Sequence, residues 1–195
     1  MIPFIWLRHP VYTWQQYRQS RAKRRKDVTW RAERNLALIR EYATVGRQAT
    51  ILSIGSRNES ELATFGQWGY ARVTYIDLFP WSPGIQRIDM HAMNFPDSAF
   101  DLVYGSHVFE HALDIGRVVA EVARVVRPGG LVFAAFPVGF TPSGHDRVDL
   151  ASASLFMARF YDWYPEPLLL TEERGEALAL FRLHHHADRV LPLQA

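Results

Sequence analysis

Apolar residues recur along this chain in two alternating patterns, short continuous runs and helical faces. Between residues 114 and 127 they recur at spacings of three and four, which predicts an amphipathic helix that Pro-Gly-Gly then ends; the face comprises Ile115, Val118, Val119, Val122, Val125 and Val126. Residues 131–136 are nearly all apolar, as expected for a strand covered on both faces. The same patterns predict a helix or arm outside the core over residues 11–28, helices over 30–44, 58–67 and 152–161, strands over 49–55, 72–77, 85–89 and 100–105, and a terminal hairpin over 167–171 and 178–184.

Strands that alternate with helices predict a parallel, doubly wound α/β sheet. In such a sheet, ligands bind beyond the carboxyl ends of the strands, where the strand order reverses. Residues at strand exits are therefore the first candidates for a functional site. One exit is Gly55, after which Asn58 and Glu61 predict a capping box at the start of a helix.

The composition limits the class of protein. With 195 residues, of which 48% are hydrophobic and 22% charged, the chain can bury one sizeable core, and we expect a soluble globular protein. The opening MIPFIWL is too short for a membrane span and lacks the basic region of a secretory signal, so we expect a cytoplasmic location and no membrane span. The chain has no cysteine, which excludes disulfides, thiolate metal sites and a cysteine nucleophile.

Charge is segregated along the chain, although the net charge is only +2. Residues 1–47 carry 11 Lys and Arg against three acids, whereas residues 48–195 carry 11 against 17. The densest run, RQSRAKRRK over residues 18–26, is either a solvated helix face or a surface for an anionic partner such as RNA, a phosphorylated sugar or a membrane surface. Aromatic residues beside it, among them Trp14 and Trp30, could stack on bases or sugars, but we favour packing onto the core.

The stretch from Ile88 to Pro137 combines several features in a set order. It has an acid at Asp89, a Phe-Asp pair opening an apolar strand, Glu-His at the strand's exit, an amphipathic helix, and Pro-Gly-Gly before another apolar strand. In this order it resembles the second half of class I S-adenosylmethionine-dependent methyltransferases. The resemblance covers residues 51–137 and implies a Rossmann-like sheet of seven strands in the order 3-2-1-4-5-7-6, with strand 7 antiparallel, in a methyltransferase domain over residues 48–195. Residues 1–47 are unmatched and are expected to form a basic N-terminal helical arm.

The resemblance also implies residues that bind the cofactor, S-adenosylmethionine. Gly55 lets the backbone approach it, Asp77 comes 22 positions later to hold the ribose hydroxyls, and Asp89 accepts from the adenine amino group while Met90 packs on the ring. The two acids have turn capping as their alternative role. The family's glycine-rich loop is altered here to SIGSRNESE, in which Arg57 either pairs with the cofactor's carboxylate or faces solvent. Further cofactor contacts are expected from Ser53, Ser56, Leu78 and Ser106.

The turn SHVFEH after the fourth strand carries the candidate chemistry. Methyl transfer requires in-line positioning, exclusion of water and, for a hydroxyl acceptor, removal of a proton. His107, Glu110 and His111 are spaced i, i+3 and i+4, so a helical turn places them on one side. Histidine titrates near neutral pH, which makes His107 and His111 the candidate catalytic residues.

The same turn has competing metal-binding interpretations. We exclude the inverzincin motif H-x-x-E-H, because a strand and a glycine precede it and the helix starts only after it. Similar Glu-x-x-Glu-His turns in ubiquinone-pathway O-methyltransferases and small-RNA 2′-O-methyltransferases bind a divalent cation. Here the ligands would be His107, Glu110 and His111, with His145 or Asp146 as a fourth. We favour the remaining interpretation, which has no metal and packs His111 near the cofactor.

The tail holds three consecutive histidines, His184, His185 and His186. Consecutive residues in a strand alternate between faces, so these side chains cannot converge on one ion. We expect an exposed strand end there.

The sequence therefore predicts S-adenosylmethionine-dependent methyl transfer to a hydroxyl or amine of a small molecule or sugar. If this acceptor is anionic, the basic arm could close over it. Only about 14 residues, 137–150, separate the fifth strand from the next helix, which leaves no added recognition domain. The alternatives are an RNA methyltransferase that uses the basic arm, and a methyltransferase-like binding or scaffold protein that has lost catalysis through the altered loop. No oligomeric state is assigned.

Overall fold

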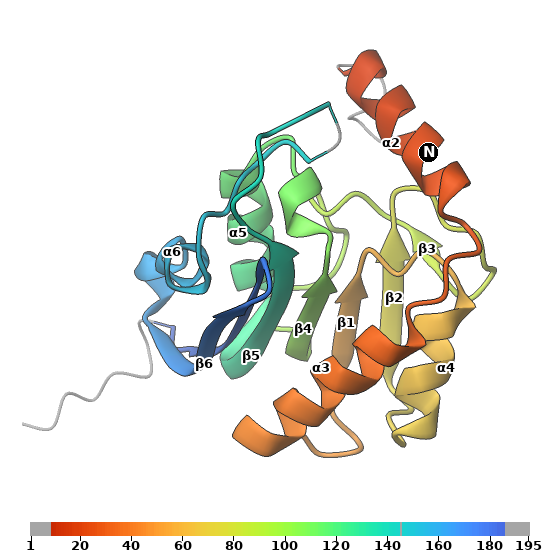
Figure 1. The fold of residues 1–195 in the computed structure, drawn as a ribbon. Helices are drawn as coiled ribbons and strands as arrows, with labels where there is room; N and C mark the ends of the chain where they lie inside the picture. Colours follow the sequence, from red (N-terminus) through yellow and green to blue (C-terminus); the bar gives the residue numbers. More distant parts are fainter. Residues whose placement is uncertain (1–8, 145, 186–195) are drawn as a thin grey trace, which may run out of the picture.

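A computed structural model describes residues 9–144 and 146–185, whose strands form one seven-stranded sheet (Figure 1). The strand order is β3-β2-β1-β4-β5-β7-β6. β7 pairs antiparallel with β5 and β6, whereas the other neighbouring strands pair in parallel. The predicted α/β class, strand order and antiparallel seventh strand are confirmed. The opening segment MIPFIWL lies outside the described residues.

Strands and helices alternate along the chain, as predicted. The strands are β1 (Ile51–Ile54), β2 (Val73–Asp77), β3 (Gln86–Arg87), β4 (Phe100–Ser106), β5 (Val126–Pro137), β6 (Pro165–Glu173) and β7 (Glu176–Leu183). The helices are α2 (Pro10–Ala22), α3 (Thr29–Tyr42), α4 (Glu59–Gln67), α5 (Ile115–Val125) and α6 (Ala153–Ala158), with short 3-10 turns η1 (Phe109–His111) and η2 (Tyr161–Trp163). Across the described ranges, no helix is long and apolar enough to cross a membrane. A cytoplasmic location stays a prediction.

The sheet has a hydrophobic core on each face. On one face, Leu36 and Ile39 of α3 and Phe65 of α4 are fully buried. On the other, Val118 and Val122 of α5 are fully buried in a second core cluster that α6 also joins. Figure 1 shows the same division of helices between the two sides of the sheet. Burying each such side chain contributes about 1.5–3 kcal/mol, so both layers hold the sheet in place.

The junction between α5 and β5 differs from the prediction. We expected the helix to include Val126 and to stop at Pro-Gly-Gly, but α5 ends at Val125 and β5 begins at the next residue. Val126 is extended and pairs with Phe100 of β4. Gly129 has a φ of +74°, and a Cβ on Gly130 would lie 2.8 Å from a backbone carbonyl oxygen. The glycines therefore accommodate an irregularity inside the strand rather than a helix stop.

The start of α4 carries only half of the predicted capping box. The Asn58 side chain accepts a hydrogen bond from the backbone N–H of Ser60 at 3.1 Å and so caps the helix. Glu61 instead points into the protein, where the Ser53 hydroxyl lies 3.5 Å from its carboxylate. Because Glu61 is only 7% exposed, it is a buried acid and not the second partner of a capping box.

The basic N-terminal helix packs against the rest of the molecule. α2 lies over the carboxyl edge of the sheet, beyond β2 and β3 (Figure 1). The Tyr12 hydroxyl donates to the carbonyl oxygen of His111 at 2.7 Å, and the Ser20 hydroxyl donates to that of Phe79 at 3.3 Å. We expected a segment outside the core, but Tyr12 is 5% exposed. The division into an arm over residues 1–47 and a domain over 48–195 stays a prediction.

Candidate functional site

Two adjoining cavities open where the strand order reverses between β1 and β4. The first, the polar cavity, has a volume of about 160 Å³ and is lined by Lys23, Lys26, Arg31, Glu61, Glu110 and Asp146, among others. The second, the apolar cavity, has a volume of about 70 Å³ and is lined by Tyr12, Ile76, Leu78, Ile88, Met90 and Val108, among others. Gly55, Arg57, His107 and His111 line both cavities, so these residues form the shared wall.

Gly55 is required by the close approach of two strand exits. Its φ is +83°, a conformation that favours glycine. A Cβ at this position would also lie 2.7 Å from Cγ2 of Val108, in the turn after β4. Because Gly55 has no side chain, the turn after β4 can approach it closely, and a ligand could contact the backbone at this position.

Asp77 ends β2 and borders the apolar cavity, as does the next residue, Leu78. One carboxylate oxygen of Asp77 accepts a hydrogen bond from the backbone N–H of Phe79 at 2.6 Å. Burial raises the pKa of Asp77, while this hydrogen bond and the charge of Arg57 oppose the rise. Asp77 thus caps a turn and also faces the cavity, so its two expected roles are compatible.

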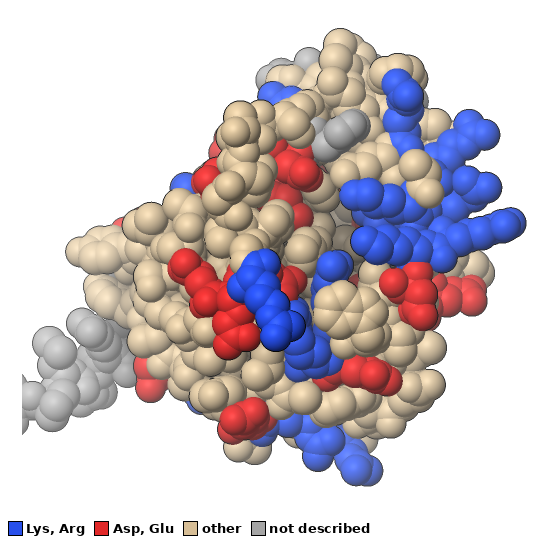
Figure 2. Space-filling view, in the orientation of Figure 1, with Lys and Arg blue, Asp and Glu red and all other residues tan. Residues whose placement is uncertain are grey.

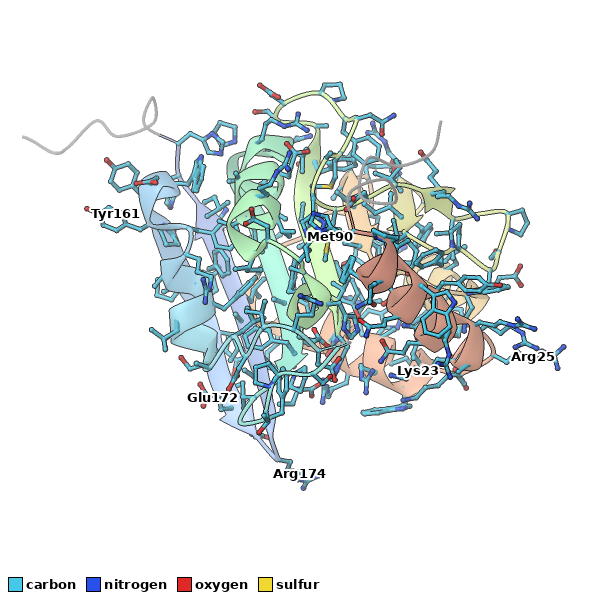
Figure 3. All side chains as sticks on the ribbon, turned by 90° about the horizontal axis from the view of Figure 1, so that it is seen from above. Lys23, Arg25, Met90, Tyr161, Glu172 and Arg174 are labelled. Atoms are coloured by element: carbon cyan, nitrogen blue, oxygen red, sulfur yellow. The ribbon has the colours of Figure 1, made fainter. Side chains whose placement is uncertain are left out.

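Asp89 and Met90 also line the apolar cavity. Met90 is 8% exposed, and Figure 3 shows it beside α2 when the molecule is viewed from above. One carboxylate oxygen of Asp89 accepts a hydrogen bond from the backbone N–H of His91 at 2.9 Å. The same oxygen lies 2.6 Å from Nδ1 of the His91 imidazole. The predicted adenine-binding pair is therefore at the cavity, but Asp89 already holds a histidine.

His91 is a residue that the sequence analysis missed. Its Nε2 lies 3.0 Å and 3.3 Å from the backbone nitrogens of Leu113 and Asp114, which donate to it. Because Nε2 accepts, Nδ1 carries the proton and donates to Asp89. His91 thus connects the apolar cavity to the start of α5. The partners lie more than 20 residues apart in sequence, so no local spacing indicated this link.

His107 is held by a carboxylate from the opposite end of the chain. Its φ of +53° is unusual for a residue other than glycine. Its Nε2 lies 2.5 Å from Oε1 of Glu176, whose other oxygen binds Arg34 at 2.6 Å. Burial raises the pKa of Glu176, but the hydrogen bonds from His107 and Arg34 outweigh it and lower the pKa to about 2. The carboxylate is therefore ionised and orients the imidazole, leaving Nδ1 3.7 Å from Oε1 of Glu110.

Glu110 and His111, on η1, approach Asp146 closely enough that one ligand atom of each lies within 4.8 Å of the others. Glu110 is 2% exposed, and its Oε2 is buried without a hydrogen-bond partner among the described residues. Burial raises the pKa of Glu110, against the opposing charges of the two neighbouring histidines. His107 is bound to Glu176 instead, and His145 lies outside the described residues. The divalent-cation interpretation is thus left with three candidate ligands and stays a prediction.

Ser53 and Ser56 lie beneath the site. Both are fully buried, and their hydroxyl oxygens are 2.7 Å apart. Glu61 lies next to them; burial raises the pKa of this carboxyl, and hydrogen bonds from Ser56, Tyr104 and Ser53 oppose the rise. The structure therefore uses the two serine side chains to hold a buried acid, and among the described wall residues of the two cavities neither serine is included.

Ser106 and Arg57 do reach the site. Ser106 lines the polar cavity and accepts a hydrogen bond from the Asn35 amide at 3.3 Å. Arg57 lines both cavities, and its Nε is buried with no hydrogen-bond partner among the described residues. Arg57 therefore faces the cavities rather than bulk solvent.

The tail histidines lie apart from this site. His184 Nε2 lies 2.8 Å from a carboxylate oxygen of Glu166 on β6. Within the described part of the chain, neither His184 nor His185 belongs to a metal-binding group, and His186 lies outside that part.

Comparison with protein families finds a match to the middle part of the chain. Residues 52–134 match the family described as Methyltransferase domain. This segment runs from β1 into β5 and includes the exits of β1, β2 and β4. A curated relative, sterol 24-C-methyltransferase erg6 of Aspergillus fumigatus, is 44% identical over 43 residues, which span 22% of this chain and 11% of that protein.

Solved structures share the fold more widely. The S-adenosylmethionine-dependent methyltransferase from Aquifex aeolicus has a TM-score of 0.58 at 11% identity, over 76% of this chain and 89% of that chain. The 1,6-didemethyltoxoflavin-N1-methyltransferase of Burkholderia thailandensis, solved with bound 1,6-didemethyltoxoflavin and S-adenosylhomocysteine, has a TM-score of 0.66 at 16% identity, over 90% of this chain and 88% of that chain. At these identities the likeness shows the shared fold.

Proposed function

We infer that this chain is a class I S-adenosylmethionine-dependent methyltransferase, and we propose that it methylates a hydroxyl or amine of a small molecule or sugar. The family match and the sheet order support the class and the cofactor. The observation that carries the proposal is the pair of cavities at the switch point, which share Gly55, Arg57, His107 and His111. One cavity suits the nucleoside of a cofactor, and the other suits a polar acceptor.

The residues at the apolar cavity fit the cofactor. Its wall offers apolar side chains for the adenine ring, with Asp89 and Met90 at one side and Asp77 at the β2 exit for the ribose. The unpartnered, buried Nε of Arg57 suits the carboxylate of the cofactor's methionine part. When bound, the cofactor supplies a methyl group on a sulfonium, which is already activated for transfer. The protein then has to position the acceptor and remove its proton.

His107 is the residue that we propose as the general base. Glu176 accepts a hydrogen bond from Nε2–H of His107. Nδ1 is then the nitrogen without a proton, and it would take the proton of the methyl acceptor. A base of this kind contributes about 10² to 10⁴ in rate. His111, which lines both cavities and has Nδ1 3.1 Å from Asp146, is proposed to pack beside the cofactor.

Calorimetric titration tests the proposal directly. The purified chain should bind both S-adenosylmethionine and S-adenosylhomocysteine. Binding of neither would favour the alternative of a methyltransferase-like binding or scaffold protein. Transfer of a labelled methyl group from the cofactor into the low-molecular-weight fraction of a cell extract would then support the acceptor class.

A second candidate is RNA methylation, because the basic residues at the end of α2 border the polar cavity. Lys23 and Lys26 line that cavity, and Arg24 and Arg25 lie between them in sequence. In the labelling experiment, counts in purified RNA rather than in small molecules would favour this candidate. RNA binding that weakens steeply with salt would accompany it.

A further inference from the structure

We propose that the mouth of the polar cavity is an anion-binding subsite, in which Lys23, Lys26 and Arg31 hold a phosphate or carboxylate group of the methyl acceptor. This inference rests on the proposed function and deepens it by naming the acceptor's chemical class. The three cations come from the end of α2, the connection to α3 and the first turn of α3.

Arg31 is the most constrained of the three cations. Its Nε is buried and has no hydrogen-bond partner among the described residues. Its guanidinium carbon lies 5.3 Å from the ring centroid of Trp30, a contact that restricts the orientation of the planar group. A buried N–H donor without a partner is costly, and an anionic oxygen in the cavity would remove that cost. Arg34, one helical turn further along α3, contrasts with Arg31 because Glu176 already matches its charge.

Lys23 faces a like charge across the same cavity. Partial desolvation of its ammonium group lowers the pKa of Lys23, and the positive charge of Arg57 lowers it further, while Asp146 and Glu110 oppose the shift. Two cations that approach each other in this way repel, and an anion bound between them relieves the repulsion. Figure 2 shows Lys and Arg side chains gathered over α2 and the connection to α3, beside a hollow in the surface.

Burial separates the charges of the polar cavity into an outer and an inner group. Lys23 and Lys26 are exposed, whereas Glu61 and Glu110 are buried. An acceptor with an anionic end would therefore bind with that end outward, because the inner wall carries carboxyl groups. Its other end would then point toward His107, which also lines the cavity.

The alternative role of these three cations is to bind the carboxylate of the cofactor instead of an anionic group of the acceptor. Arg57 lines both cavities and is placed to serve the cofactor, whereas Lys23, Lys26 and Arg31 line only the polar cavity. The subsite should therefore stay available when the cofactor is bound.

The test is calorimetric titration of the protein, saturated with S-adenosylhomocysteine, with inorganic pyrophosphate and separately with malonate at constant ionic strength. At least one of the two probes should bind, and the tighter one identifies the preferred anion. Lys23→Gln and Arg31→Gln should each weaken binding of that probe about tenfold, because each removes a charge-assisted contact. The affinity for S-adenosylhomocysteine should stay within about twofold of the parent in both variants, which also shows that they are folded.

Arg25→Gln is the matched control. It removes one positive charge from the same segment, but Arg25 projects away from the body of the molecule, whereas Lys23 lies nearer to it (Figure 3). Arg25 is also absent from the described wall of the polar cavity. Its substitution should leave anion binding unchanged.

Three outcomes would overturn the subsite: neither probe binds, Arg25→Gln weakens binding as much as Arg31→Gln, or the probe displaces S-adenosylhomocysteine. The last would mean that the cations serve the cofactor. A protein that binds pyrophosphate through Arg31 but never binds S-adenosylhomocysteine would overturn the proposed function instead, and the assignment of the anion to a methyl acceptor with it.

Discussion

The two cavities of the site differ in how the chain builds them. The apolar cavity takes its largest single part, eight of the 18 residues on its described wall, from residues 76–91, where β2, β3 and their connections follow one another, and α2 contributes four more. The polar cavity is assembled from the end of α2, the start of α3, the loop after β1, the turn after β4 and the loop that holds Asp146. The apolar cavity therefore depends more on local order in the sequence and the polar cavity more on tertiary packing, so substitutions of residues that line only one of them should separate the two.

The largest effect is expected where the two cavities meet. Gly55→Ala forces a positive φ on a residue with a side chain and drives its Cβ to 2.7 Å from Val108. We expect a loss of about 2–4 kcal/mol in the free energy of unfolding, together with loss of S-adenosylhomocysteine binding. Urea unfolding and calorimetry measure both quantities.

Gly139→Ala is the control for that substitution. Gly139 has a φ of +70°, but a Cβ there would meet nothing within 4 Å. The variant should lose only about 1–2 kcal/mol in the free energy of unfolding, because alanine disfavours a positive φ, and cofactor binding should stay intact. Equal losses in the two variants would show that the approach of Val108 is unimportant.

Asp77→Asn should disrupt the apolar cavity alone. If Asp77 accepts from the two ribose hydroxyls of the cofactor, as we propose, loss of its charge should weaken S-adenosylhomocysteine binding about 10-fold to 100-fold, while pyrophosphate binding stays unchanged. Since burial raises the pKa of Asp77, binding by the parent should weaken as pH falls and the carboxylate is protonated. Binding by the variant should vary less with pH. A variant that lost both ligands equally would contradict the separation of the two cavities.

Glu176→Gln should disturb the shared wall at His107 while leaving the residues that only the apolar cavity uses in place. The variant loses the ion pair with Arg34 and the acceptor for His107, so it should be about 1–2 kcal/mol less stable at pH 7. Because the folded pKa of Glu176 is about 2, below the ordinary 4.5, its contribution exists above pH 4.5 and is lost as pH falls toward 2. The gap between parent and variant in urea unfolding should therefore narrow in acid. Turnover should also fall, with S-adenosylhomocysteine affinity retained.

Glu61→Gln should have the smallest effect, and a stabilising one. Burial raises the pKa of Glu61, so the stability that its protonated form provides is lost as pH rises through that pKa. The variant avoids this loss and should be about 1 kcal/mol more stable than the parent at pH 8, with less advantage at pH 5. Glu33→Gln, on the exposed side of α3, should show neither change. A constant difference across this pH range would mean that Glu61 is not the titrating group.

The fold was predictable because its information is local and ordered. Alternating strand and helix patterns indicated a doubly wound sheet, and the resemblance carried by residues 88–137 implied seven strands with an antiparallel seventh. The predicted boundary between α5 and β5 was wrong, because valines suit both a helical face and a strand. Only the pairing of Val126 with Phe100 decides between them.

The candidate site was predictable where it follows strand exits. Gly55 and Asp77, at strand exits, and Met90, which the resemblance implied, all line cavities, while their roles toward the cofactor stay predictions. Glu176 was missed because it lies 69 residues from His107 in sequence, and only the pairing of β7 with β5 brings it near. Spacing along α4 assigned Glu61 to a cap, although its direction depends on the serines beneath it.

The contacts of α2 have a consequence for the time course of the reaction. Tyr12 and Ser20 bond to backbone carbonyls on either side of the apolar cavity, and Tyr17 packs edge-on against Phe79. Because α2 supplies part of the cavity wall, a nucleoside bound there would leave more readily when the helix lifts. Tyr12→Phe, which removes one of the hydrogen bonds that hold α2, should therefore shorten the dwell time of the spent nucleoside.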